Sequence, residues 1–298
     1  MVADEFLEKG IPKKPIFKVL DLPRSSYYYV SKGTKAGKQP LKYVLTKQGI
    51  KVPICEVVNS IKTLLGGEFV DYGYYKTYRY LTDELGYRIG STRTYNLMKA
   101  AQLLKFQRSN IKRLNRNWVK ELVPKVDTEF SFLEFDIKYI YIQGKRTNAQ
   151  VLTILDVFSR WNLGQYIAYS IKADDVIVLF EKLFQEYNLP KCFIVRNDNG
   201  SQFEAAIVQQ FLIGKGIKQE FTKPATPQQN AHIESYHSIL ESAVCQRFEF
   251  ENLEDLKNTM NRWRDFYNFD RIHGGIGYKS PYRVLKNLGI DMKLNYKK

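Results

Sequence analysis

Between residues 54 and 104, apolar side chains recur every three or four positions, which is the spacing of amphipathic helices. This pattern predicts three short helices, separated by a Gly66-Gly67 break and by Gly86. We expect Ser91 to N-cap the third helix. Its outward face would carry Arg93, Asn96 and Lys99. Three short helices ending on a basic one are typical of a helix-turn-helix, whose last helix enters the major groove of DNA, although a plain three-helix bundle shows the same pattern.

From residue 130 onwards the period changes to two, and aromatic and β-branched residues become frequent. The first part of this region predicts an antiparallel meander of three strands, over residues 130–142, 151–158 and 162–169. Helices and short buried strands then alternate, with helices near 176–183, 207–212, 231–248 and 252–268 and strands near 192–195 and 217–221. Three strands followed by alternating helices and strands predict an α/β fold with a mixed sheet.

The chain has 298 residues and a formal charge of +15, and the excess lies almost wholly in its front part. Residues 1–126 carry 24 Lys and Arg against 10 Asp and Glu, whereas residues 127–298 carry 22 against 21. This asymmetry favours nucleic-acid binding over a merely soluble basic surface. No apolar run approaches about 18 residues, which excludes a membrane span, and no apolar signal core follows Met1. Three scattered cysteines exclude a disulfide framework and a zinc finger.

Pattern and charge together divide the chain into five expected segments. These are a basic N-terminal segment (1–50), a helix-turn-helix-like DNA-binding domain (51–105), a basic linker (106–126), an α/β core (127–250) and a C-terminal helical extension (251–298). We expect the linker to contact DNA phosphates, which gives affinity without sequence information, although a solvated charged helix is the alternative. The expected contacts are Arg108, Lys112, Arg113 and Arg116.

Three acidic residues stand where such a core would expose them. Asp136 lies inside the first strand, Asp198 directly follows the strand 192–195, and Glu234 lies in the first turns of a helix. The last two are separated by 35 residues. An acid in a β-rich segment is costly unless its charge is compensated, and Mg²⁺, which prefers carboxylate oxygens, would compensate it. A lone strand Asp is more often a salt-bridge residue, but the three together favour a site for two ions, which can act on a phosphodiester.

Two further acids, Glu134 and Asp156, are alternatives for this site. We expect Asp156 to be structural and keep Glu134 as a second candidate metal ligand. Near the C-terminus, Arg271 and His273 follow a helix with an apolar inner face, and we expect both to pack against the core.

Several stretches around these acids carry a specific resemblance. They are Phe135-Asp136-Ile137, Ile154 through Arg160, Asn197 through Phe203, Thr226 through Ser235, and a C-terminal group of Tyr267-Asn268, Arg271, His273 and Ser280-Pro281. Together they resemble the DDE core of bacterial insertion-sequence transposases and retroviral integrases, which share a ribonuclease H-like fold. Val19 through Tyr28 and Tyr72 through Lys99 resemble the start and the helix-turn-helix of the downstream catalytic reading-frame product of these elements.

The resemblance implies a fold and a function. The fold would be a ribonuclease H-like mixed five-stranded sheet with helices, preceded by a small all-α helix-turn-helix domain. Asp136, Asp198 and Glu234 would bind two Mg²⁺ ions, with Mn²⁺ as a substitute, and would cut and join DNA at the ends of a mobile element. The implied partners are double-stranded DNA at element ends and target, further copies of this chain on that DNA, and an upstream reading-frame product; the implied location is the bacterial cytoplasm. The alternatives are a nuclease that cuts without joining and a retired transposase that only binds DNA.

This sequence departs from the family pattern at three places. Arg196-Asn197 replaces a common His-Ser before the second acid, Lys138 replaces a small polar residue, and Glu241 replaces a basic one. We expect Lys138 to contact phosphate or to compete with a metal ion. Further DNA contacts are expected near the Glu234 helix at Gln228, Gln229, Asn230 and His237.

Overall fold

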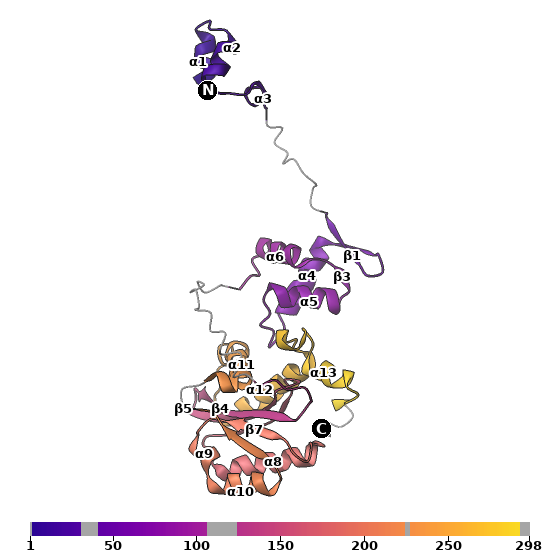
Figure 1. Cartoon of the computed structure of the whole chain (residues 1–298), viewed down its shortest axis with the longest axis vertical. Coiled ribbons are helices and arrows are strands. Elements are labelled where there is room, and N and C mark those ends of the chain that lie inside the picture. The colour runs from indigo at the N-terminus through magenta and orange to yellow at the C-terminus, as the bar shows by residue number, and fades with distance from the viewer. Residues whose placement is uncertain (1, 31–40, 106–123, 224–226, 293–298) are drawn as a thin grey trace. The chain divides into compact units, whose positions relative to one another are not determined.

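The structure, a computed structural model, describes residues 2–30, 41–105, 124–223 and 227–292 (Figure 1). The chain divides into two compact units, residues 1–42 and residues 43–298. The first unit contains three short helices, α1 (Val2–Glu8), α2 (Lys13–Val19) and α3 (Arg24–Tyr27). Tyr27 links them, because its hydroxyl donates to Asp4 at 2.7 Å and its ring packs on Phe17. Within the described ranges, no helix is both long and apolar enough to span a bilayer.

The second unit begins with a small domain that contains the three expected helices, α4 (Ile54–Leu65), α5 (Tyr74–Asp83) and α6 (Ser91–Ala100). This domain is not all-α, which corrects the expectation. It also holds a sheet in the order β2-β1-β3, formed by β1 (Tyr43–Thr46), β2 (Lys51–Pro53) and β3 (Tyr87–Arg88). Strands of two to four residues are too short to show a period of two. Because β1 belongs to this sheet, the domain starts before residue 51.

The start of α6 also differs from the expectation. Ser91 is the first residue of the helix, and Gly90 occupies the N-cap position with extended backbone and no side-chain cap. The helix therefore begins one residue earlier than a Ser91 cap requires. Buried apolar residues on all three helices, Val57, Ile61, Leu81 and Met98 among them, form the core of the domain.

The main sheet has five strands in the order β6-β5-β4-β7-β8. Its strands are β4 (Phe132–Ile142), β5 (Thr147–Asp156), β6 (Asn162–Ala168), β7 (Ile194–Asn197) and β8 (Lys218–Phe221). The first three pair antiparallel as the predicted meander, and β7 and β8 run parallel to β4. This is the mixed five-stranded sheet of a ribonuclease H-like fold, as expected.

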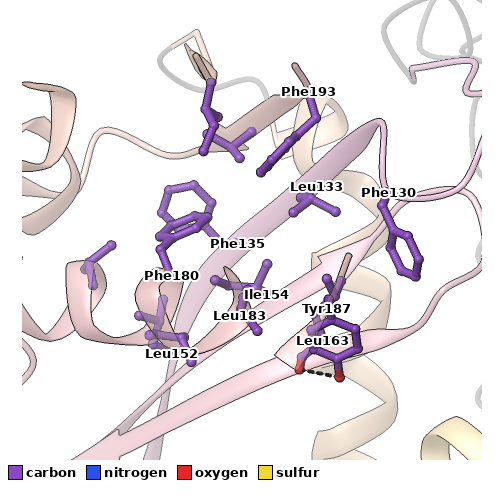
Figure 2. Close-up of a cluster of buried hydrophobic side chains, with 14 of the residues drawn as sticks. Phe130, Leu133, Phe135, Leu152, Ile154, Leu163, Phe180, Leu183, Tyr187 and Phe193 are labelled. Atoms are coloured by element: carbon purple, nitrogen blue, oxygen red, sulfur yellow. Dashed lines mark hydrogen bonds between the residues drawn. The ribbon is translucent and has the colours of Figure 1, made fainter. Parts of the chain in front are cut away.

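Helices cover both faces of this sheet (Figure 1). On one face lie α8 (Ala173–Glu186), α9 (Ser201–Glu204) and α10 (Ala206–Gly214), and on the other lie α11 (Ala231–Leu240) and α12 (Leu253–Asp265). The first face packs Phe135 of β4 against Phe180 of α8, and the hydroxyl of Tyr187 donates to the Leu163 carbonyl at 2.9 Å (Figure 2). The second face packs other β4 residues against α11 and α12.

Short irregular helices connect these elements near the C-terminus. They are η1 (Pro227–Asn230), the π-helical turns η2 (Glu241–Cys245) and η3 (Phe266–Asp270), η4 (Gly274–Ile276), and a last α-helix, α13 (Pro281–Asn287). Asn252 caps α12 by accepting from two backbone N–H groups. Trp263 and Tyr267 are buried in the same cluster as β4 and β5, so the C-terminal helices complete the second layer of the core.

Candidate active site

Asp136 lies on β4, on the side of the sheet that α11 covers, because alternate residues of a strand point to opposite faces. Its side chain is 24% exposed, and its Oδ1 accepts a hydrogen bond from the backbone N–H of Ile137 at 2.7 Å. Burial, then the negative charges of Asp198 and Glu234, raise the pKa of Asp136 to about 7. The three acids that the sequence singles out therefore lie within electrostatic reach of one another.

Asp198 directly follows β7, at the turn that the sequence predicts. Because β4 and β7 are parallel and Glu134 is opposite Arg196, two further residues along each strand bring Asp136 and Asp198 to neighbouring positions. The Asp198 side chain is exposed, and its Oδ1 accepts from the backbone N–H of Gly200 at 3.0 Å. This bond fixes the turn that holds the second acid.

Glu234 lies in the first turn of α11 and is exposed. Burial, followed by the charge of Glu134, raises its pKa. The start of α11 is held by Glu134, whose Oε2 accepts from the backbone N–H groups of His232 at 3.0 Å and Ile233 at 2.8 Å. A carboxylate at a helix N-terminus accepts hydrogen bonds from otherwise unpaired backbone N–H groups. Its negative charge also interacts favourably with the positive end of the helix dipole. Glu134 therefore positions the helix that carries Glu234.

The other alternative acid, Asp156, has the structural role that we expected. It is fully buried and accepts from the backbone N–H of Phe130 at 3.0 Å and of Ser159 at 2.8 Å. Burial raises its pKa to about 6. These bonds fix the turn between β5 and β6 rather than the acid cluster.

The three carboxylates fit a hard divalent cation in their donor chemistry, since Mg²⁺ prefers oxygen ligands. The raised pKa of Asp136 reflects burial first and then repulsion from Asp198 and Glu234, and a bound cation would favour the charged carboxylate against both. In the described ranges, no three His, Cys, Asp or Glu side chains are arranged so that they could hold one ion. Ion binding would therefore have to draw the exposed Asp198 and Glu234 side chains towards Asp136.

One further side chain of α11, His237, lies beside Asp136. His237 is 12% exposed, and its Nδ1 is 3.5 Å from Asp136 Oδ2. Burial, then the nearby charge of Lys138, lowers the pKa of His237 to about 4, so the imidazole is neutral at pH 7. His237 is thus turned into the protein, next to the first acid, rather than along an open helix face.

Lys138 and Glu241, two of the departures from the family pattern, contact each other. Lys138 Nζ lies 2.8 Å from Glu241 Oε2. Lys138 points to the same side of β4 as Asp136, and Glu241 is the first residue of η2. The hydrogen bond from Lys138 lowers the pKa of Glu241.

The third departure, Arg196, anchors the loop before α11. Its guanidinium donates to the backbone carbonyl of Gln229 at 2.9 Å and to Glu220 Oε2 at 2.9 Å. The Gln229 side chain accepts from the Lys223 backbone N–H at 2.7 Å, and Asn230 is buried. Both expected DNA contacts thus lie on a loop fixed by Arg196, a role that the sequence does not reveal because it depends on a contact 33 residues away.

The remaining expected DNA contacts belong to the small domain and the linker. Asn96 and Lys99 are exposed on α6. Arg93 is half-buried and donates to the backbone carbonyl of Tyr43 at 3.0 Å, so it connects α6 to β1. Several expected contacts lie outside the described residues, namely Arg108, Lys112, Arg113, Arg116 and the side chain of Gln228.

A buried ion pair that the sequence analysis missed joins the small domain to the C-terminal helices. The Arg271 guanidinium, 1% exposed, binds the carboxylate of Asp71. The backbone N–H of Ile272 donates to the Tyr72 hydroxyl at 3.0 Å. Arg271 and His273 are both buried, as expected. The two motifs that meet here are 200 residues apart, so only the fold reveals their pairing.

A cavity of about 710 Å³ opens beside the start of α11. His232, which contacts Glu134, lies at its wall. Three basic residues line it, Lys125, Arg160 and Lys279, against one acid, Asp127. Its charge suits an anion close to the carboxylate cluster.

Comparison with known proteins places these features in a family. Residues 128–227 and residues 215–281 each match a family described as Integrase core domain, and together the matches span about half of the chain. The putative integrase ORF3 of Spiroplasma virus SpV1-C74 is 27% identical over 180 residues, which are 54% of this chain and 49% of that protein. The chain thus spans about half the length of this relative.

Two further similarities extend the comparison. The putative transposase InsK for insertion sequence element IS150 of Escherichia coli K12 is 24% identical over 272 residues, covering 89% of this chain and 90% of that protein. The HTLV-2 integrase catalytic core domain in complex with magnesium has a TM-score of 0.41 and 14% identity, over 52% of this chain and 95% of that one.

Proposed function

Since the chain belongs to the integrase core family, as an insertion-sequence transposase with an integrase-like core and hence a polynucleotidyl transferase, we propose that it cuts DNA at the ends of a mobile element and joins those ends to new DNA. The observation that supports the proposal most is that Asp136 feels the negative charges of both Asp198 and Glu234. A strand, a strand end and a helix N-terminus each contribute one carboxylate. Burial, followed by the negative charges of the other two, raises the pKa of the most buried one, Asp136.

The proposed reaction has two steps that need no covalent bond to the protein. Water attacks a phosphorus atom at the element end and releases a 3′-oxygen, which becomes a hydroxyl. That hydroxyl then attacks a phosphorus atom of the target and displaces another 3′-oxygen, so one phosphodiester forms as one breaks. Asp136, Asp198 and Glu234, whose charges act on one another, are the groups that would serve both steps.

The residues of the chain have separate tasks in this proposal. Asp136, Asp198 and Glu234 would hold two divalent ions, Mg²⁺ or Mn²⁺. When bound, the ions supply Lewis-acid stabilisation of the attacking and leaving oxygens. Glu134 keeps α11 against β4, and Arg196 keeps the Gln229 loop in place beside the cluster.

DNA binding in this proposal uses several basic regions. Lys99 and Asn96 on α6 contact the element end, and the linker residues 106–126 contact phosphates. Lys125, Arg160 and Lys279 in the cavity beside α11 contact the backbone next to the cut. The protein works on chromosomal DNA in the bacterial cytoplasm, as several copies on the two ends, with an upstream reading-frame product as a further partner.

The second candidate is a retired transposase that only binds DNA. The three carboxylates are not arranged to hold an ion as they stand in the described part of the chain. This candidate predicts DNA binding without chemistry under every metal condition.

A duplex carrying the inverted repeat that flanks the gene tests the proposal. Wild type, Asp136→Asn and Glu234→Gln are incubated with it in Mg²⁺ or Mn²⁺, with and without the upstream product. Cleaved and joined strands from wild type alone support a transposase. Cleavage without joining supports a nuclease, and binding without any reaction in all conditions supports the retired protein.

A further inference from the structure

The Lys138–Glu241 pair lies next to the acid cluster but belongs to none of the tasks above. Lys138 is two residues past Asp136 on the same face of β4, about 7 Å along the strand. Its side chain is 27% exposed, so the ammonium is reachable from solvent at the cluster. The pair therefore stands where a DNA strand must approach the three carboxylates.

An approaching DNA phosphate needs a cation here, because three carboxylates repel it. Two other side chains of this face have partners of their own. Arg196 binds Glu220 and the Gln229 carbonyl, and His237 is only 12% exposed, with its Nδ1 3.5 Å from Asp136 Oδ2. Lys138 is the cation beside Asp136. Among the ion pairs of the described residues, its one partner is the partly exposed carboxylate of Glu241.

We propose that Lys138 contacts a phosphate oxygen of the DNA strand at the active site, and that Glu241 holds Lys138 in position until the phosphate replaces it. This inference rests on the proposed function. A partly exposed ion pair contributes little to stability, so a phosphate can replace Glu241 as the partner of Lys138 at little cost. The Glu241 side chain is 40% exposed and can move away when displaced.

The geometry also decides against the alternative that Lys138 competes with a metal ion. Its ammonium is bound to Glu241 on η2, and no ion pair joins it to Asp136 in the part of the chain that the structure describes. The π-helical turn that starts at Glu241 is a kind of irregularity frequent at functional sites. Two departures from the family pattern thus form one ion pair, between Lys138 on β4 and Glu241 on η2.

The experiment measures binding of the element-end duplex over a range of salt concentrations, together with strand joining. Lys138→Met keeps the aliphatic stem and removes the charge. Its matched control is Lys145→Met, which removes the same charge from the exposed β4–β5 turn. We expect Lys138→Met to lower the slope of log affinity against log salt by about 0.9 and to reduce joining, while Lys145→Met keeps both.

Exchange of the two side chains separates a DNA contact from a structural pair. Lys138→Glu/Glu241→Lys rebuilds an ion pair but moves the cation to η2, so we expect it to keep the thermal midpoint without restoring the slope or joining. Glu241→Gln releases Lys138, and we expect it to keep the slope and slow joining. A wild-type slope in Lys138→Met, with only the thermal midpoint lowered, overturns the inference.

Failure of the inference and failure of the proposed function give different results. If the wild type binds the duplex but never cuts or joins it, the proposed function fails, and the salt slopes still test the Lys138 contact. If the wild type joins strands and Lys138→Met matches Lys145→Met in slope and in joining, the inference alone fails.

Discussion

Glu134 and Ile233, 99 residues apart in sequence, are joined by a hydrogen bond of 2.8 Å from the backbone N–H of Ile233 to Glu134 Oε2. Glu134 is two residues from Asp136, and Ile233 precedes Glu234. One contact therefore fixes the strand that carries the first acid against the helix that carries the third. Because the bond is buried, with Glu134 fully inside, it holds this arrangement before any DNA or metal binds.

Replacing Glu134 by Gln keeps the shape of the side chain and removes its charge. The uncharged side chain binds the N–H groups of α11 less strongly, so we expect a loss of about 1–3 kcal/mol in the free energy of unfolding. DNA strand joining should fall with it, because Glu234 is less well placed. Urea unfolding measures the first effect, and Glu181→Gln, at an exposed position of α8, is the matched control. Equal stability of the two variants would contradict the role of Glu134.

The Asp71–Arg271 pair is expected to stabilise the docking of the small domain on the C-terminal helices. Arg271→Met leaves the Asp71 carboxylate without its main partner, and we expect a loss of about 3–5 kcal/mol. The double variant Asp71→Asn/Arg271→Met should recover part of it, since no uncompensated charge remains. Arg283→Met breaks the more exposed pair with Glu84 and should cost less than about 1 kcal/mol. Urea unfolding in which Arg271→Met loses no more than Arg283→Met would refute this account.

The raised pKa of Asp136 makes stability depend on pH. Its folded pKa is about 7 against 3.8 for the ordinary group, so between about pH 4 and pH 7 the folded protein keeps a proton that the unfolded chain has lost. Raising the pH through this window therefore lowers the stability, by at most about 1.4 kcal/mol per pH unit. We expect Asp136→Asn to have a higher thermal midpoint than wild type at pH 8 in EDTA, and the difference to shrink towards pH 5.

Other groups with shifted pKa values also make stability depend on pH, so the comparison with Asp136→Asn is needed. Asp156, with a pKa of about 6, acts in the same direction, and His237, with a pKa of about 4, acts in the opposite one. Both are present in wild type and variant. Adding Mg²⁺ at pH 8 should raise the thermal midpoint of wild type only. An identical pH profile in the two proteins would show that Asp136 is not the titrating group.

The exposed face of α6 gives a prediction for DNA binding. Lys99→Gln should weaken binding to all duplexes alike and lower the salt slope by about 0.9, as expected for a phosphate contact. Asn96→Ala should instead lower the preference for the element end by about 1–3 kcal/mol, as expected for a base contact. Fluorescence anisotropy with specific and random duplexes measures both, with Lys62→Gln on α4 as the control. If Lys99→Gln and Lys62→Gln bind DNA equally, α6 is not the recognition helix.

The core fold could be predicted from the sequence because its signals are local. β4 has eleven residues and β5 has ten, which is long enough for a period of two to appear, and each helix of the core has an apolar stripe. The strands β1 to β3 were missed because they have two to four residues. The pairing of β1 with β3 also depends on contacts between residues about 40 apart, such as Leu45 and Arg88.

The candidate acids could be predicted for the same reason, since a strand, a turn and the start of an amphipathic helix each mark one of them. The supporting contacts could not. In the sequence, Glu134 is only an alternative acid for the site. Its role becomes clear from the hydrogen bond that it accepts at the start of α11. Lys138 and Glu241 are visible as two unrelated departures, and only the fold brings them to 2.8 Å.

We propose that Asp136, Asp198 and Glu234 form one metal site. The most direct test is Mn²⁺ binding to the protein–duplex complex, measured by calorimetry for wild type, Asp136→Asn, Asp198→Asn and Glu234→Gln, with Glu181→Gln as control. We predict that each of the three substitutions weakens binding about 10-fold or more and that the control binds as wild type does. Wild-type Mn²⁺ affinity in all three variants would contradict the claim.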